Sequence, residues 1–207
     1  DITGMLMGEA AADKLRELFD VEPPQEEGLN AVHACEALLE GRVNSLISLG
    51  GNLVRALPDR ERMETAWADL DLTVYIATKP NRSHLTPGKA SFLLPCLGRT
   101  DRDEQASGPQ STSIEDSLSH IYGSVGPADP PGPEVRSEVA IVAGIAKATL
   151  APNPKLAWDA WTGDYALIRD LIARTYPDDF ARFNERMFEP GGFYRGNGDD
   201  EDHEDGA

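Results

Sequence analysis

Residues 43–52 read VNSLISLGGN, a short run of branched apolar residues that stops at a Gly-Gly-Asn turn. The run at 43–49 is typical of a strand buried on both faces of a parallel sheet. Residues 60–69 have a helical composition, and residues 70–77 (LDLTVYIA) combine β-branched and aromatic residues in a second strand. Strand, helix and strand in this order predict a right-handed βαβ unit.

Two polar segments leave the predicted sheet at the carboxyl ends of these strands. The first is Gly50-Gly51-Asn52, and the second contains Lys79, Asn81, Arg82, Ser83 and His84. Ligands of α/β proteins bind at this edge of the sheet, and glycines let backbone N–H groups approach an anion closely. The sequence therefore indicates an anion site at the two exits. An ordinary left-handed turn at residues 50–52 is the alternative.

The formal charge of the chain is −17, which argues against nucleic acid as a partner because phosphate contacts need a basic face. Six acidic residues fall within 199–205, and we expect a disordered tail there. Residues 79–102 differ, since five cations there face only Asp101, a local balance of +4. A small anionic ligand is therefore compatible with this chain.

The composition also bounds the compartment and the chemistry. No secretory signal is visible and no apolar run reaches membrane-spanning length, so we expect a cytoplasmic protein without a membrane span. Cys35 and Cys96 form neither a CxxC pair nor a disulfide framework. The four histidines lack zinc-like spacing. We predict no metal site and no catalytic residue in this chain.

The remaining segments complete the predicted architecture. We expect helices at 8–19, 28–39 and 134–150, a strand at 91–95, a loop at 96–109 and a linker at 126–133. Residues 110–122 fit either a short strand pair or the start of a helix, and we favour extended structure. Aromatic residues from Trp158 to Phe183 recur at helical spacing and predict two or three short helices that pack on the sheet domain. The predicted fold is α/β, with a doubly wound, mostly parallel, Rossmann-like domain at 1–150, a helical extension at 151–193 and an acidic tail at 194–207.

Several charged residues have simple structural interpretations. Asp59 precedes the helix at 60–69 and is expected to be its N-cap. Glu115-Asp116 is a carboxylate pair with no partner for acid–base catalysis nearby. A solvated, self-paired loop is expected at Arg99, Asp101, Arg102 and Asp103.

Short motifs follow one another through most of the chain. They are SLGGNLV (48–54), ATKPNRSHL (77–85), LLPCLGRT (93–100), QASGPQ (105–110), IEDS (114–117), RSE (136–138), Tyr165 with RDLI (169–172), FN (183–184) and EPGGF (189–193). This series resembles the molybdopterin-dependent oxidoreductases, and more narrowly the formate dehydrogenase-like alpha subunits of bacteria. In that family a long catalytic subunit binds a bis(molybdopterin guanine dinucleotide) cofactor of molybdenum or tungsten between two α/β nucleotide-binding halves. The chain resembles the second half.

The resemblance implies a role for each strand exit. Gly50, Gly51 and Asn52 would lie on the phosphates or ribose of one guanine dinucleotide. The pocket around its guanosine and pyrophosphate would be lined by Thr78, Lys79, Asn81, Arg82, Ser83 and His84. Loops carrying Arg99 and Gln110 would approach the pterin. The implied partners are the remainder of the catalytic subunit and a small substrate such as formate.

The sequence also departs from the family pattern. No iron–sulfur segment and no cysteine or selenocysteine metal ligand can be located, and Cys96 matches a family cysteine outside the metal-ligand position. We therefore expect Cys96 to be structural and the chain alone to be inactive. The alternative function is a free-standing nucleotide- or anion-binding or interaction module without redox activity. A cofactor domain predicts a groove open on one side beside exposed apolar surface, whereas the free-standing module predicts a closed surface.

Overall fold

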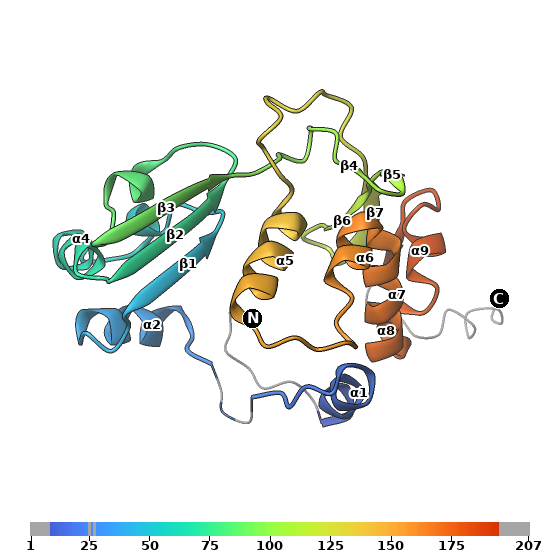
Figure 1. Ribbon diagram of the computed structural model, residues 1–207, viewed down its shortest axis with the longest axis horizontal. Helices are drawn as coiled ribbons and strands as arrows, with labels where there is room; N and C mark the ends of the chain where they lie inside the picture. The colour runs from blue at the N-terminus through green and yellow to red at the C-terminus, as the bar shows by residue number, and fades with distance from the viewer. Residues whose placement is uncertain (1–8, 25, 27, 195–207) are drawn as a thin grey trace, which may run out of the picture. The chain divides into compact units, whose positions relative to one another are not determined.

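The computed structural model describes residues 9–24, 26 and 28–194, which form two compact units (Figure 1). The first unit contains residues 24–98 and 132–144, and the second contains residues 9–23, 99–131 and 145–194. Each unit is therefore assembled from separate stretches of the chain. The start of the helix predicted at Gly8 and the acidic tail beyond Tyr194 lie outside the described residues. The division at residues 150 and 193 stays a prediction.

The first unit is built on a parallel three-stranded sheet in the order β1-β2-β3 (Figure 1). Its strands are β1 (Ser45–Leu49), β2 (Leu72–Ala77) and β3 (Ala90–Pro95). Helices α3 (Leu53–Ala56) and α4 (Arg60–Ala68) connect β1 to β2, and the 3-10 helix η1 (Arg82–Leu85) lies between β2 and β3. The parallel βαβ connection and the third strand predicted from the sequence are confirmed.

One face of this sheet packs against α2 (Ala31–Leu39) and α4. The buried cluster contains Leu38, Val54, Met63, Trp67, Leu70 and Tyr75. Within it the indole Nε1 of Trp67 donates to the hydroxyl of Tyr75 (2.6 Å), and this hydroxyl donates to the carbonyl of Thr86 (3.1 Å). This chain of hydrogen bonds fixes α4 on the sheet and joins both to the loop after η1.

The opposite face of the sheet carries an exposed apolar row. Ile47, Val74 and Phe92 are direct partners in the parallel register, so their side chains lie on the same face. Ile47 is 57% exposed and Phe92 is 58% exposed, while Val74 between them is half-buried. The unit is thus a mixed α/β structure with a parallel sheet, and a doubly wound, Rossmann-like arrangement stays a prediction.

In this unit, α2 ends before Gly41 and α4 begins after Asp59, as the sequence predicted. Asn30 caps α2 by accepting the N–H of His33 (2.9 Å), and Gly41 follows the helix with φ of +69°. Asp59 occupies the N-cap position of α4 as predicted, but its side chain makes no capping hydrogen bond. Its carboxylate instead pairs with Arg62 (2.7 Å).

The second unit combines short antiparallel strands with helices. Its sheet has the order β6-β7-β8, from β6 (Thr112–Glu115), β7 (His120–Ser124) and β8 (Phe193–Tyr194). A hairpin is formed by β4 (Glu104–Gln105) and β5 (Gly108–Pro109). The helices are α1 (Glu9–Phe19), α6 (Trp158–Gly163), α7 (Tyr165–Thr175), α8 (Pro177–Phe180) and α9 (Phe183–Arg186). The extended structure and the short C-terminal helices are confirmed, whereas the predicted loop at 96–109 contains the hairpin.

The aromatic residues of the C-terminal helices form the core of this second unit. Ile121, Phe183, Met187 and Phe193 are buried together, and the rings of Phe183 and Phe193 meet edge to face at 5.5 Å between centroids. These aromatic residues therefore pack within their own unit, whereas packing on the parallel sheet domain stays a prediction. The remaining helix, α5 (Glu138–Thr149), supplies residues to both units. Of the helices described, none combines the length and apolarity that crossing a bilayer requires.

Replacing Tyr75 with Phe should destabilise the first unit, because the indole of Trp67 loses its buried acceptor. We expect a loss of about 1–3 kcal/mol in the free energy of unfolding. Urea denaturation followed by fluorescence, in a Trp158→Phe, Trp161→Phe background, reports on Trp67 alone. Tyr122→Phe, in the second unit, is the control. Equal stability of the Tyr75→Phe and control proteins would contradict this prediction.

Candidate functional site

The two strand exits predicted from the sequence lie side by side in the first unit. Because β1 and β2 are parallel neighbours, their carboxyl ends meet at one edge of the sheet. The backbone N–H of Gly50 donates to the carbonyl of Ile76 (2.7 Å), and the side-chain amide of Asn81 donates to the carbonyl of Gly51 (2.8 Å). The loop after β2 is thus tied to the glycine turn after β1.

A buried serine connects the same two loops. Ser83 is 2% exposed, and its hydroxyl donates to Oδ1 of Asn52 (3.2 Å) and accepts the backbone N–H of Val54 (3.3 Å). Val54 belongs to the buried cluster around Trp67. One hydroxyl therefore positions Asn52 and the first turn of α3 relative to the core.

The glycine turn needs glycine for its conformation and leaves its backbone open. Gly50 and Gly51 have φ of +69° and +74°, in a region that costs other residues about 1–2 kcal/mol. No atom lies within 4 Å of the position that a Cβ would occupy on either residue. A ligand can therefore approach this backbone without meeting a side chain.

The loop after β2 is shaped by a capping box around Asn81. Oδ1 of Asn81 accepts the N–H of Ser83 (3.0 Å), and the N–H of Asn81 donates to Nδ1 of His84 (2.8 Å). The ring of His84 stands edge-on to Tyr75, with 5.0 Å between centroids. Asn81 and His84 thus stabilise the conformation of the loop. The Oδ1 of Asn81 and the Nδ1 of His84, which the sequence suggested as ligand-binding atoms, are therefore already hydrogen-bonded within the loop.

The cations at this edge differ in whether a carboxylate already neutralises them. Nη2 of Arg82 lies 3.3 Å from Oε1 of Glu64, which also pairs with Arg60 (3.2 Å). Lys79 and Arg55 are exposed, and neither forms an ion pair with any residue in the described part of the chain. Sequence reasoning missed Arg55, although its place in α3, directly after the glycine turn, was a usable signal.

The structure therefore sorts the predicted site residues into three groups. Hydrogen bonds between the loops bring together Gly50, Gly51, Asn52, Asn81 and Ser83. Thr78 and Lys79 are exposed at the carboxyl end of β2. Arg82 and His84 are engaged by Glu64 and Tyr75. Cofactor binding by these residues stays a prediction.

Gln110 and Arg99, expected near a pterin, belong to the second unit. Gln110 is buried, and its Nε2 donates to the hydroxyl of Ser107 (2.8 Å) and the carbonyl of Gly108 (2.7 Å). Its Oε1 accepts the backbone N–H of Tyr165 (2.8 Å). Both ends of this amide are occupied in holding the β4–β5 hairpin against α7. Arg99 is exposed.

The expectation of a solvated, self-paired loop at residues 99–103 is wrong for Asp103. Asp103 is buried, and its carboxylate accepts hydrogen bonds from the hydroxyl of Tyr165 (2.5 Å) and the amide of Gln105 (2.6 Å). Arg102 pairs with Asp129 (3.1 Å) instead. Tyr165 lies 62 positions from Asp103 in the sequence, so a local interpretation cannot supply this partner.

Arg169 is a second buried charge that sequence reasoning did not single out. Its Nε donates to Oδ1 of Asn184 (2.6 Å), and its Nη1 donates to the carbonyl of Ser111 (2.8 Å). Burial lowers the pKa of its guanidinium from the ordinary value. The side chain joins α7, α9 and the start of β6, so it acts in the architecture of the second unit.

Of the two carboxylates at 115–116, Asp116 has a structural role. Oδ1 of Asp116 accepts the N–H groups of Leu118 (2.8 Å) and His120 (3.0 Å). These bonds lower the pKa of Asp116. The residue shapes the turn between β6 and β7.

Cys96 is buried where β3 ends. Its Sγ lies 3.8 Å from Oε1 of Glu138, and burial together with this charge raises the pKa of the thiol to about 11. Leu97 donates its N–H to the carbonyl of Arg136 (2.9 Å), which joins the segment before α5 to this strand end. Such a thiol fits a structural role. Within the described ranges, no three His, Cys, Asp or Glu residues are grouped as a metal site requires.

Comparison with known proteins finds relatives over most of the chain. No family model matches the sequence. Protein YdeP of Escherichia coli O6:H1 is 43% identical over 182 residues, which are 88% of this chain and 24% of YdeP. YdeP of Escherichia coli K12 is 42% identical over 181 residues, 87% of this chain and 24% of YdeP.

A second group of relatives comes from mycobacteria. Uncharacterized oxidoreductase Rv2900c of Mycobacterium tuberculosis H37Rv is 40% identical over 177 residues, which are 84% of this chain and 22% of that protein. The chain thus spans about a quarter of the length of the curated relatives it matches.

Replacing Ser83 with Ala should loosen the linked strand exits, because the N–H of Val54 and Oδ1 of Asn52 each lose a partner. An unsatisfied buried donor costs about 1–3 kcal/mol, so we expect faster amide hydrogen exchange at Val54. Ser113→Ala, at an exposed position on β6, is the control. Exchange at Val54 that matches the parent protein would show that the hydroxyl does not hold the turn.

Cys96 should react slowly with iodoacetamide in the folded protein, since the thiolate is the nucleophile and its pKa is raised. Cys35, half-buried on α2, is the internal reference and should be alkylated first at about pH 8. Glu138→Gln removes the neighbouring charge, which should lower the pKa of Cys96 and speed its reaction. A slower reaction in Glu138→Gln would contradict the assigned cause.

The same shift predicts a pH dependence of stability. The pKa of Cys96 in the folded protein, about 11, lies above its ordinary value of 9.0. The folded state therefore binds this proton more tightly, and the contribution to stability is complete below pH 9 and lost as the pH rises toward 11. Cys96→Ser should reduce the fall in stability across this window in urea titrations.

Proposed function

We propose that this chain is the cofactor-binding domain of a larger oxidoreductase and holds one guanine dinucleotide arm of a bis(molybdopterin guanine dinucleotide) cofactor of molybdenum or tungsten. The name uncharacterized oxidoreductase, carried by the mycobacterial relatives, supports the redox class. The motif series supports the finer assignment to a formate dehydrogenase-like subunit. Because the relatives are about four times as long, turnover of a small substrate such as formate, in the cytoplasm, is proposed for the longer polypeptide.

The observation that carries this proposal is the pair of linked strand exits. Open α/β sheets bind their ligands at the carboxyl ends of the strands. Here this edge presents two consecutive glycines with no neighbouring atom where a Cβ would lie, and the hydroxyl of Ser83 holds the residues that follow them against the core. Lys79 and Arg55 add positive charge at an edge of a chain whose net charge is −17.

The chain's own residues would bind and orient the cofactor. Gly50 and Gly51 leave room for a pyrophosphate to approach the turn, and the N–H of Gly50 is already held by the carbonyl of Ile76. Lys79 and Arg55 would neutralise the phosphates, and Thr78, exposed beside them, can hydrogen-bond a ribose or phosphate oxygen. When bound, the cofactor would supply the two-electron redox chemistry.

The exposed apolar row of Ile47, Val74 and Phe92 supports a domain that belongs to a larger protein. Parallel sheets are normally covered on both faces, and exposed apolar patches mark contact sites. We propose that the remainder of the catalytic subunit covers this row. A free-standing nucleotide- or anion-binding or interaction module, which predicts a closed surface, is less well supported by the exposure of Ile47 and Phe92.

Calorimetric titration with GDP, a mimic of the guanine dinucleotide arm, tests the site. We expect saturable binding that is at least about fivefold weaker in Lys79→Ala, because a cation at the exit is lost. Lys89→Ala is the matched control. Lys89 is also exposed, but it is paired with Asp71 (2.8 Å) and precedes β3, at the amino ends of the strands.

A backbone variant tests the glycine turn separately. Gly51→Val places a β-branched residue at φ of +74° and covers the open backbone, so GDP binding should be lost while circular dichroism shows a folded protein. Absence of binding at about 5 mM GDP, or equal weakening in Lys79→Ala and Lys89→Ala, would contradict the proposed site.

A further inference from the structure

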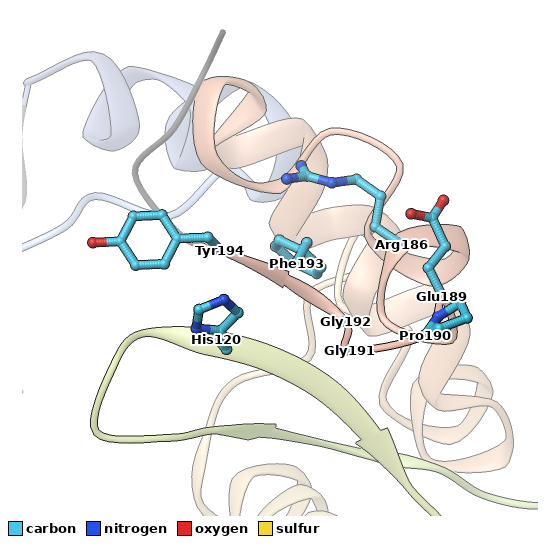
Figure 2. Close-up of a pocket in the computed structure, with 8 residues that line it drawn as sticks. All are labelled: His120, Arg186, Glu189, Pro190, Gly191, Gly192, Phe193 and Tyr194. Atoms are coloured by element: carbon cyan, nitrogen blue, oxygen red, sulfur yellow. The ribbon is translucent and has the colours of Figure 1, made fainter. Parts of the chain in front are cut away.

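The second unit contains a pocket that is separate from the strand exits. It has a volume of about 410 Å³ and is lined by Arg186, His120, Tyr194, Phe193 and residues 189–192. Figure 2 shows Arg186 reaching across Phe193, with His120 and Tyr194 together at one end and Glu189 and Pro190 at the other. This volume lies in the range of small-molecule sites, roughly 300–1,000 Å³.

The guanidinium of Arg186 is held in place before any ligand arrives. It stacks over the ring of Phe193, 4.1 Å from the ring centroid, and its Nη1 donates to the carbonyls of Ala181 (3.1 Å) and Asp179 (3.4 Å). Neither Nε nor Nη2 makes a hydrogen bond to any described residue. These two groups form the fork that matches a carboxylate or phosphate in bidentate geometry.

Two ring systems stand at one end of the same pocket. His120 and Tyr194 are cross-strand partners on β7 and β8, and their ring centroids are 5.4 Å apart at an angle of 58°. The backbone N–H of His120 is fixed by Asp116 (3.0 Å), while no side-chain hydrogen bond of His120 or Tyr194 is found within the described residues. The two rings therefore offer planar surface and free polar atoms.

The glycines at 191–192 make this arrangement possible. Gly192 has φ of +69°, and a Cβ there would lie 2.0 Å from the carbonyl oxygen of Ile121. Only glycine lets the chain pass so close to β7 and deliver Phe193 to the core and Tyr194 to the pocket. The shape of the pocket therefore depends on the backbone conformation at Gly192.

We propose that this pocket binds a small planar ring that carries an oxyanion, either an aromatic carboxylate or an aryl phosphate. The oxyanion would meet the Nε and Nη2 groups of Arg186, and the ring would lie against Tyr194 and His120. Glu189, at the other end, disfavours a second negative charge, so a monoanionic carboxylate should bind more tightly than a dianionic phosphate. The inference is independent of the cofactor site in the first unit.

Chemical-shift titration of the full chain, following the imidazole signals of His120 and the ring signals of Tyr194, tests the pocket. The probes are benzoate and phenyl phosphate, with benzamide as the neutral ring and cyclohexanecarboxylate as the non-planar anion. We expect saturable shifts with benzoate, and at least about fivefold weaker binding of benzamide and of cyclohexanecarboxylate. Tighter binding of phenyl phosphate with the same dependence on Arg186 would contradict the role assigned to Glu189 and would assign the pocket to aryl phosphates instead of carboxylates.

Two variants separate the fork from the ring surface. Arg186→Lys keeps the charge but removes the fork, and Tyr194→Ala removes an exposed ring without touching the core. Each should weaken benzoate binding by at least about fivefold. Tyr176→Ala, which removes a similarly exposed tyrosine outside the pocket, should leave it unchanged. No saturable shift at about 20 mM benzoate, equal binding of benzamide, or full affinity in Tyr194→Ala would overturn the proposal.

Discussion

The geometry of the strand exits depends on the two hydrogen bonds of the Ser83 hydroxyl. This hydroxyl joins residues 29 and 31 positions away in the sequence, and it does so from a buried position where a lost partner is costly. The hydroxyl contacts Asn52 and Val54, which directly follow the glycine turn. Ser83 itself belongs to a loop that the hydroxyl of Tyr75 ties to the core. The packing around Trp67 therefore fixes the position of the glycine turn at this edge.

Much of this architecture could be predicted because short stretches of sequence determine it. Branched apolar runs predicted β1, β2 and β3, and helical composition predicted α4 and the short C-terminal helices. The strand β8 escaped prediction because two residues are too few for an alternating pattern, and the hairpin of β4 and β5 escaped for the same reason. Asp103 was misjudged because its partner, Tyr165, lies 62 residues away. The two exits were predicted to meet because parallel neighbours must end at one edge, whereas the pairing of Arg82 with Glu64 required the folded chain.

The two candidate sites illustrate different ways to receive an anion. At the strand exits, the turn consists of glycines without side chains, and Lys79 and Arg55 have no carboxylate partners among the described residues. In the second unit it fixes one guanidinium by stacking and by two carbonyls, so that a defined edge remains. Motif residues such as Gln110 and Arg169 belong to neither arrangement, since hydrogen bonds within the second unit occupy them. A shared motif can therefore record the architecture of a domain as well as its chemistry.

The order in which the chain visits its units has a consequence for inheritance. Residues 99–131 of the second unit interrupt the first, and α5 contributes to both. At the end of β3, Cys96 and Leu97 pair with Arg136, which the chain reaches after that interruption. No single cut frees either unit whole, so recombination within this region would leave both with missing pieces. A segment built in this way is expected to pass between genes as one block.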